Sequence, residues 1–128
     1  MSSNNNKETT DDPDIKIIVI GDAAVGKSKM IERFLENDFN NFRLSTHALT
    51  LYRKDVVLGD GKVVKTDVWD TGGQEKFNSL HASYYFQADV AIMVFDVTRK
   101  STYANLKIWY EELRQHCEEI PVILVANK

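Results

Sequence analysis

The 128-residue chain has one cysteine, two prolines and no long apolar run. The single cysteine, Cys117, excludes a disulfide within the chain and fits a reducing compartment such as the cytosol. No stretch approaches the roughly 18 consecutive apolar residues that a membrane-spanning helix needs. Residues 1–13 lack the apolar segment of a signal peptide, and Ser2 stands where N-myristoylation requires glycine. We therefore expect a cytoplasmic protein without a transmembrane segment.

The sequence also lacks a basic block, and its formal net charge is −3. This argues against nucleic acid as a partner, and membrane association stays open. Apolar residues make up 43% and charged residues 27%, which is ordinary for a soluble globular domain. We expect a monomer with a polar, disordered tail over residues 1–13 and one domain over residues 14–128.

Residues 21–28 read GDAAVGKS, which fits the pattern G-x-x-x-x-G-K-[ST]. An apolar stretch precedes it, and Met30, Ile31, Phe34 and Leu35 follow it at helical spacing. In a strand–loop–helix unit, the backbone N–H groups of the loop and the helix N-terminus surround a phosphate. Lys27 then reaches the β- and γ-phosphates, and the Ser28 hydroxyl binds Mg²⁺. The phosphate-binding segment comprises Asp22, Ala23, Ala24, Val25, Gly26, Lys27, Ser28 and Lys29.

A second segment carries further groups suited to this chemistry. Asp70 ends an apolar strand, where an aspartate supports the metal ion. In the following TGGQE, a glycine N–H can bond a γ-phosphate oxygen, and Gln74 can orient an attacking water. Thr46 lies in a polar stretch, where its hydroxyl can complete the Mg²⁺ shell when a γ-phosphate is present.

The hydrophobic pattern predicts strands over about 14–20, 48–58, 62–69, 91–95 and 122–125 and helices over about 27–36, 76–86 and 101–117. Residues 37–47 are predicted to be irregular, and the turn at 59–61 pairs two strands antiparallel. This is an α/β fold, a three-layer doubly wound sheet that is mostly parallel with one antiparallel edge strand. Leu106, Trp109, Tyr110 and Leu113 are predicted to form one buried helical stripe. Asn127 and Lys128 end a parallel strand, where ligands bind in such sheets.

Residues 21–28, 70–75 and 127–128, in this order, resemble the motifs of the Ras superfamily of small GTPases. Residues 69–71, 74–77, 84–85 and 95–97 resemble the Rab branch of that superfamily. Residues 44–52, 81–85, 93–96 and 109–114 resemble the Rab-like protein 2 family within it. The resemblance implies a P-loop GTPase domain and a GTP-binding switch that hydrolyses GTP slowly. It further implies effectors in the intraflagellar transport complex and a location at the cilium base.

The resemblance also implies roles for single residues. Gly73 would contact the γ-phosphate, Gln74 would orient the water, and Phe39 would stack on guanine. Asn127 and Lys128 would hold the base and brace the phosphate loop. The implied Mg²⁺ ligands are Ser28, Thr46 and Asp70, and the implied effector-facing triad is Leu51, Trp69 and Tyr84.

Three departures from the family pattern leave alternatives open. Ala24 and Gly72 replace the usual Gly and Ala, and the sequence stops before the aspartate of the family motif Asn-Lys-x-Asp. We therefore expect a C-terminally truncated domain with an incompletely covered sheet, which on its own binds GTP weakly or not at all and hydrolyses it negligibly. One alternative is an ATP-using P-loop kinase or ATPase. The other is a non-catalytic interaction module that still presents the two switch surfaces, which the resemblance implies over about residues 40–48 and 72–84.

Overall fold

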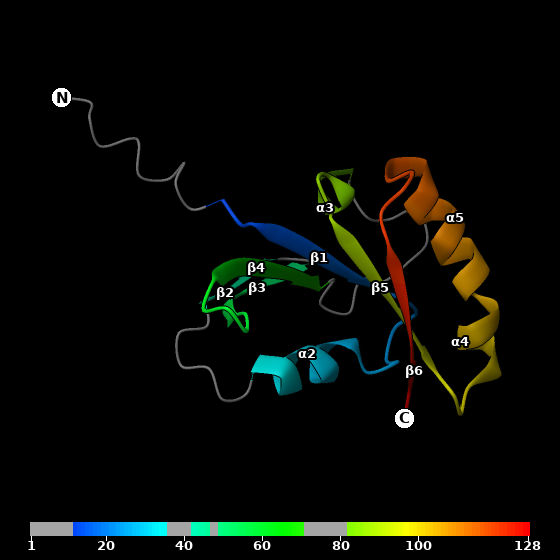
Figure 1. Cartoon of the computed structure of the whole chain (residues 1–128). Helices are drawn as coiled ribbons and strands as arrows, with labels where there is room; N and C mark the ends of the chain where they lie inside the picture. Colours follow the sequence, from blue (N-terminus) through cyan, green and yellow to red (C-terminus); the bar gives the residue numbers. More distant parts are fainter. Residues whose placement is uncertain (1–11, 36–41, 47–48, 71–81) are drawn as a thin grey trace.

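The computed structural model describes residues 12–35, 42–46, 49–70 and 82–128. Figure 1 shows helices on both sides of a twisted sheet, with α2 on one side and α4 and α5 on the other. The elements are β1 (Ile15–Ile20), α2 (Lys27–Leu35), β2 (Phe42–Thr46), β3 (Leu49–Val57), β4 (Val63–Asp70), α3 (Ala82–Tyr85), β5 (Val90–Asp96), α4 (Lys100–Ala104), α5 (Leu106–His116) and β6 (Val122–Asn127).

The strand order in the sheet is β2-β3-β4-β1-β5-β6. Strands β4, β1, β5 and β6 pair in parallel, whereas β3 runs antiparallel to both of its neighbours. Strands β1 and β5 are nearly unbroken apolar runs because helices cover both of their faces. The predicted α/β class, mostly parallel with helices on both faces, is confirmed.

The core on the α5 side fixes one face of β1. Trp109 and Leu113 of α5 pack against Ile18, Ile20 and Met93 of the two central strands. Trp109 and Leu113 are four residues apart, so both point to the same side of the helix. This contact holds the carboxyl end of β1 beside α5, and the phosphate loop starts there.

The core on the α2 side fixes the other face of the same strands. Ile31 and Leu35 of α2 pack with Val19 and Val94, and Val25 of the loop joins this cluster. The loop is therefore tied to the sheet by an apolar side chain of its own. Among the helices that the structure describes, none has both the length and the apolar character to cross a membrane.

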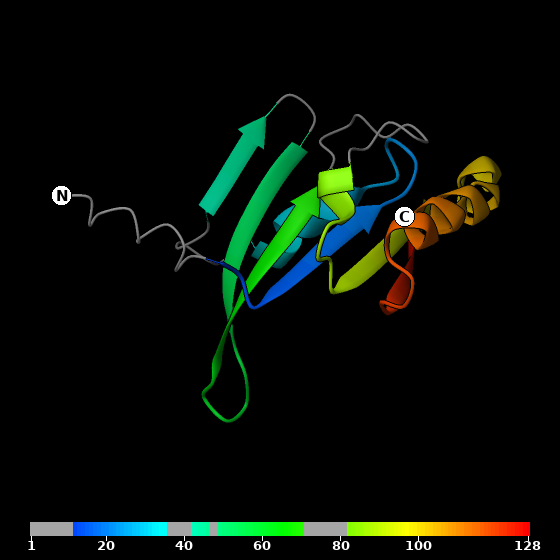
Figure 2. The ribbon, with the colours of Figure 1, turned by 90° about the horizontal axis from the view of Figure 1, so that it is seen from above.

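Two predictions about the sheet are wrong. Residues 42–46 form β2, although residues 37–47 were predicted to be irregular. Because β2 pairs only with β3, it depends on that tertiary contact, and its five residues give too short a pattern to detect. The predicted antiparallel edge strand, β3, consequently lies inside the sheet, and β2 is the edge. Figure 2 shows the β3–β4 hairpin projecting beyond the other strands.

Two of the predicted helices differ from the observed helices in their extent. The predicted helix over 101–117 is divided into α4 and α5 around Asn105. Of its predicted buried stripe, Leu106, Trp109 and Leu113 are buried, but Tyr110 is 43% exposed. Tyr110 follows Trp109 by one position, about 100° around the helix, and its ring faces the Arg114 guanidinium at 4.9 Å. Of the predicted helix over 76–86, residues 82–85 form α3, and 76–81 lie outside the described residues.

Candidate nucleotide-binding site

The phosphate loop, residues 21–28, connects β1 to the first turn of α2. Its backbone has positive φ at Gly21 (147°), Ala24 (63°) and Gly26 (98°). A Cβ on Gly21 would lie 2.3 Å from the Val94 carbonyl oxygen, and one on Gly26 would lie 2.2 Å from Asn127 Nδ2. The two glycines therefore allow β5 and β6 to approach the loop closely. Ala24 has a Cβ in the left-handed region, which costs about 1–2 kcal/mol.

Lys27 places its ammonium group over this loop. The residue is only 3% exposed, and its Nζ donates to the carbonyl oxygens of Gly21 at 3.1 Å and Asp22 at 2.7 Å. A cationic donor forms stronger hydrogen bonds with an anionic oxygen than with a neutral carbonyl. The position of Lys27 therefore suits it to bind phosphate oxygens that enter the loop.

Ser28 and Asp70 come together at the start of α2, although they are 42 residues apart. The Ser28 hydroxyl donates to Asp70 Oδ2 at 2.5 Å. Asp70 is 1% exposed, and its other oxygen, Oδ1, is buried without a hydrogen-bond partner among the described residues. A carboxylate and a hydroxyl are oxygen ligands that Mg²⁺ prefers, so this pair fits a magnesium ion.

The structure does not describe the side chain of the third predicted Mg²⁺ ligand. Thr46 ends β2, but its side chain lies outside the described residues. In the described parts of the chain, no group of three or more His, Cys, Asp or Glu side chains could hold a metal ion. A site at Ser28 and Asp70 would therefore need hydroxyl groups, water or phosphate oxygens as its further ligands.

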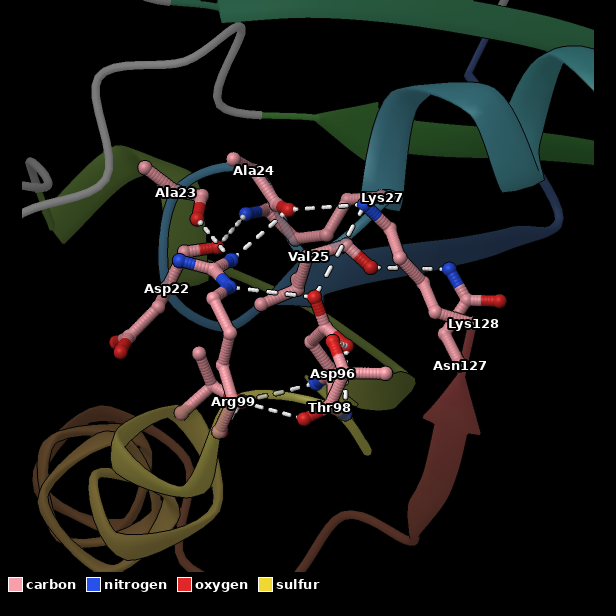
Figure 3. A network of polar contacts seen from close by, with 11 residues as sticks. Asp22, Ala23, Ala24, Val25, Lys27, Asp96, Thr98, Arg99, Asn127 and Lys128 are labelled. Atoms are coloured by element: carbon pink, nitrogen blue, oxygen red, sulfur yellow. Dashed lines mark hydrogen bonds and ion pairs between the residues drawn. The ribbon is translucent and has the colours of Figure 1, made fainter.

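Asn127 and Lys128 meet the phosphate loop from the end of β6 (Figure 3). The Asn127 side-chain amide donates to the Val25 carbonyl at 2.9 Å across 102 residues. Lys128 Nζ lies 3.4 Å from the Ala24 carbonyl oxygen. The pair thus braces the loop, as the family resemblance implies, and its position as base ligands stays a prediction.

Asp22 ties the loop to the junction of α4 and α5. Its Oδ1 accepts a hydrogen bond from Trp109 Nε1 and its Oδ2 accepts one from Asn105 Nδ2, both at 2.8 Å. Sequence reasoning identified Trp109 only as core and missed Asn105. The available signal was the indole N–H, because a buried tryptophan usually needs an acceptor.

Asp96, at the end of β5, is a second anchor that the sequence reasoning missed. Its Oδ1 accepts hydrogen bonds from the Thr98 hydroxyl at 2.6 Å and the Thr98 backbone N–H at 2.8 Å. Its Oδ2 accepts one from Arg99 Nε at 3.2 Å and lies 4.0 Å from Lys128 Nζ. These partners, Thr98 foremost, lower the pKa of Asp96 to about 2. An aspartate two residues before a threonine was the available sequence signal, since Asp often bonds its own backbone two residues on.

Arg99 completes the contacts to the loop. Its Nη2 donates to the carbonyl oxygens of Ala23 at 3.0 Å and Ala24 at 2.9 Å (Figure 3). In each contact the two residues are 75 or 76 positions apart in the sequence, so no local sequence pattern predicts it. The structure thus brings donors from the end of β6, from the segment between β5 and α4, and from the α4–α5 region to a single loop.

The remaining predicted residues divide into two groups. Lys29 lies exposed in α2, one position after Ser28. Phe39, Gly73 and Gln74 lie outside the described residues, so their predicted roles stay predictions.

The predicted effector-facing triad is brought together in the structure. Leu51 and Trp69 are paired across β3 and β4, and the Trp69 and Tyr84 rings meet edge to face at 6.0 Å. However, Tyr84 is only 4% exposed, and its hydroxyl lies 2.8 Å from the carbonyl oxygens of both Val19 and Trp69. In this conformation Tyr84 offers little surface to a partner, so the triad's role stays a prediction.

Comparison with known proteins places this geometry in a family. The model of the Ras family matches residues 16–128. Rab-like protein 2A of Homo sapiens is 57% identical over 117 residues, which cover 91% of this chain and 51% of the relative. Rab-like protein 2A of Mus musculus is 60% identical over 114 residues (89% and 51%). Ras-related protein RABA1b of Arabidopsis thaliana is 42% identical over 114 residues (88% and 52%).

The chain spans about half the length of the curated relatives it matches. The residues that match the family model nevertheless include the phosphate loop and the pair Asn127 and Lys128. They also include all the described strands, except that β1 is matched from its second residue onward. The predicted resemblance is confirmed: the chain belongs to the Ras family.

Proposed function

We propose that the protein is a GTP-binding switch that hydrolyses GTP slowly and binds effector proteins in its GTP state. One observation supports this more than any other. The Asn127 amide holds the Val25 carbonyl at 2.9 Å, so the predicted base-binding pair lies against the loop predicted to bind phosphate. A nucleotide spanning both sites would contact the two motifs at once. The family membership of the chain supports guanine as its base.

The residues of the loop would bind and orient the nucleotide phosphates. The backbone N–H groups of residues 22–29 would surround the β-phosphate, and the Lys27 ammonium would contact the β- and γ-phosphates. Ser28 and Asp70, with Thr46, would hold Mg²⁺, which neutralises phosphate charge when bound. Gln74 would orient the attacking water, and Gly73 would donate its N–H to the γ-phosphate.

The finer part of the proposal concerns partners and location. Phe39 would stack on the base, and Leu51, Trp69 and Tyr84 would contact effectors once the GTP state rearranges them. The resemblance of the sequence to the Rab-like protein 2 family implies partners in the intraflagellar transport complex and a cytoplasmic location at the cilium base. These assignments come from the resemblance alone.

Nucleotide titration of the purified protein tests the core of the proposal. Fluorescent GDP and GTP should bind saturably with Mg²⁺ present, and ADP at equal concentration should not displace them. Displacement by ADP would favour an ATP-using enzyme, and no binding of either nucleotide would favour a non-catalytic module.

Single-turnover hydrolysis tests the catalytic part. Without an arginine finger, we expect a GTP hydrolysis rate of about 10⁻⁴–10⁻² s⁻¹. Gln74→Leu should slow hydrolysis further and leave GTP affinity nearly unchanged. An unchanged rate in Gln74→Leu would remove this residue from the mechanism.

A pull-down tests the switch. Intraflagellar transport proteins should be recovered with the GTP-loaded protein and not with the GDP-loaded protein, because only the γ-phosphate offers contacts to both Thr46 and Gly73. Equal recovery from both states would contradict the effector model.

A further inference from the structure

Arg99 is the one cationic side chain of the α4–α5 region that reaches the phosphate loop in the described structure. Position 99 belongs to none of the sequence motifs that predict nucleotide binding. We propose that Arg99 is a positioning residue, which holds the left-handed turn at Ala24 in shape and thereby slows nucleotide release. This inference rests on the proposed function, because it concerns the same loop.

The first step concerns the backbone that Arg99 contacts. Successive backbone N–H groups converge on an anion when a right-handed residue is followed by a left-handed one. Ala24 supplies a left-handed residue, with φ of 63°. When N–H groups converge inward, the carbonyl groups of the same residues point outward. Arg99 binds two of these outward carbonyls, those of Ala23 and Ala24, at 3.0 and 2.9 Å.

The second step concerns the cost of the turn. A left-handed backbone is free of steric cost for glycine but not for alanine, whose Cβ approaches its own carbonyl. Ala24 therefore needs contacts that hold it there. Its carbonyl lies within reach of Arg99 Nη2 at 2.9 Å and Lys128 Nζ at 3.4 Å. These two donors offset a strain that glycine would not have.

The third step explains why an arginine suits this place. The Arg99 guanidinium donates from Nη2 to two successive carbonyls and at the same time from Nε to Asp96 Oδ2, and a lysine has only one nitrogen for these contacts. The Arg99 side chain is 44% exposed, so packing does not account for its position. Asp96 Oδ2, which Arg99 Nε approaches to 3.2 Å, aims the guanidinium at the loop. Figure 3 shows this carboxylate between Arg99 and Lys128.

The competing interpretation is that Arg99 only pairs with Asp96. A pair between a half-exposed arginine and a buried aspartate would contribute to stability but not to ligand kinetics. The two interpretations differ in whether nucleotide release changes when the guanidinium is removed, and in whether that change depends on residue 24.

The experiment measures release of fluorescent GDP from the purified protein in Arg99→Gln, in Ala24→Gly and in the double variant. Arg99→Gln should release GDP about tenfold faster, equivalent to about 1.4 kcal/mol. In the Ala24→Gly background the same substitution should change release less than about threefold, because glycine needs no clamp.

Arg114→Gln is the matched control. Arg114 also donates to two carbonyl oxygens, those of Cys117 at 3.2 Å and Ile120 at 3.0 Å, but at the far end of α5. It should leave GDP release unchanged. An unchanged rate in Arg99→Gln, or the same acceleration with and without Ala24→Gly, would overturn the inference while nucleotide binding by the unmodified protein stands. No saturable GDP binding by the unmodified protein would refute both the inference and the proposed function.

Discussion

The phosphate loop is held from two sides that differ in kind. On the motif side, Lys27, Asn127 and Lys128 donate to loop carbonyls from residues that the sequence motifs contain. On the corner side, Arg99, Asn105 and Trp109 reach the loop from the α4–α5 region. The motif-side residues are the ones predicted to contact the nucleotide, so we expect their removal to change nucleotide affinity directly. Corner-side groups bind only protein atoms, so they should act through the shape and stability of the loop.

The largest expected effect belongs to the motif side. Lys27→Ala removes an ammonium that would contact two phosphates, and each charge-assisted hydrogen bond is worth about 1.5–3 kcal/mol. We expect GDP affinity to fall at least about a hundredfold, measured by fluorescence titration. Lys107→Ala is the control, because Lys107 is an exposed lysine of α5 outside the site. Equal GDP affinity in Lys27→Ala and Lys107→Ala would remove Lys27 from the site.

The two glycines of the loop separate damage to the fold from damage to the site. In Gly21→Ala, the new Cβ meets the backbone oxygen of Val94, which cannot move without β5. In Gly26→Ala, it meets the Asn127 side chain, which can turn away but loses its bond to Val25. Both variants are also strained by positive φ.

We expect Gly21→Ala to lower the free energy of unfolding by about 3 kcal/mol, near the upper end of the usual cost of overpacking. Gly26→Ala should cost less stability and should weaken GDP binding more than its loss of stability explains. Urea denaturation and GDP titration of both variants measure this difference. A larger loss of stability in Gly26→Ala would mean that the backbone of β5 moves away from a new Cβ at less cost than the Asn127 side chain does.

The corner side can be tested through the Asp22–Trp109 hydrogen bond. Trp109→Phe keeps an aromatic ring in the core but removes the Nε1 donor. Asp22 Oδ1 then loses the hydrogen bond that it accepts from Trp109. Because this hydrogen bond is only partly buried, its loss should cost at most about 1–3 kcal/mol, and the smaller ring adds a cavity.

A double-mutant cycle with Asp22→Ala isolates that bond in urea denaturation. The two losses of stability should sum to more than the loss in the double variant, because both single variants break the same contact. Additive losses would show that the bond does not hold the loop to α5.

The two sides also differ in what could be predicted from sequence. Lys27 and Ser28 were predicted because the spacing of their motif between a strand and a helix reflects one local geometry, and Asp70 was predicted because it ends an apolar strand. The α/β class followed from the apolar runs at β1 and β5, whose burial on both faces leaves a clear pattern.

The corner side left no comparable pattern. The Arg99 guanidinium bonds backbone carbonyls, and a carbonyl is present at every position, so no residue type in the loop indicates the contact. Trp109 was predicted to be buried because helical spacing reports the direction of a side chain, but spacing does not report which acceptor its N–H meets. Strand β2 was missed for a related reason, since only its pairing with β3 stabilises it.

The smallest expected effect concerns the charge of Asp96, which links the two sides through Arg99 and Lys128. The folded protein holds the pKa of Asp96 at about 2, against about 3.8 for an ordinary aspartate, chiefly through the Thr98 hydrogen bonds. Between these values the unfolded chain binds more protons than the folded protein, so the stability due to Asp96 falls as the pH falls. It is fully present above about pH 4 and is lost progressively toward pH 2.

We therefore expect the difference in unfolding free energy between the unmodified protein and Asp96→Asn to stay constant from pH 7 to about pH 5 and to shrink below about pH 4. Urea denaturation at a series of pH values measures it. Thr98→Val removes the hydroxyl donor that contributes most to the lowered pKa, so in that background the pKa of folded Asp96 lies closer to 3.8, and the difference should shrink by less and level off at a higher pH. A difference that stays constant down to pH 3 would show that Asp96 keeps no charge that matters to the fold. Arg99 and Lys128 would then be held to the loop by their bonds to its carbonyls alone.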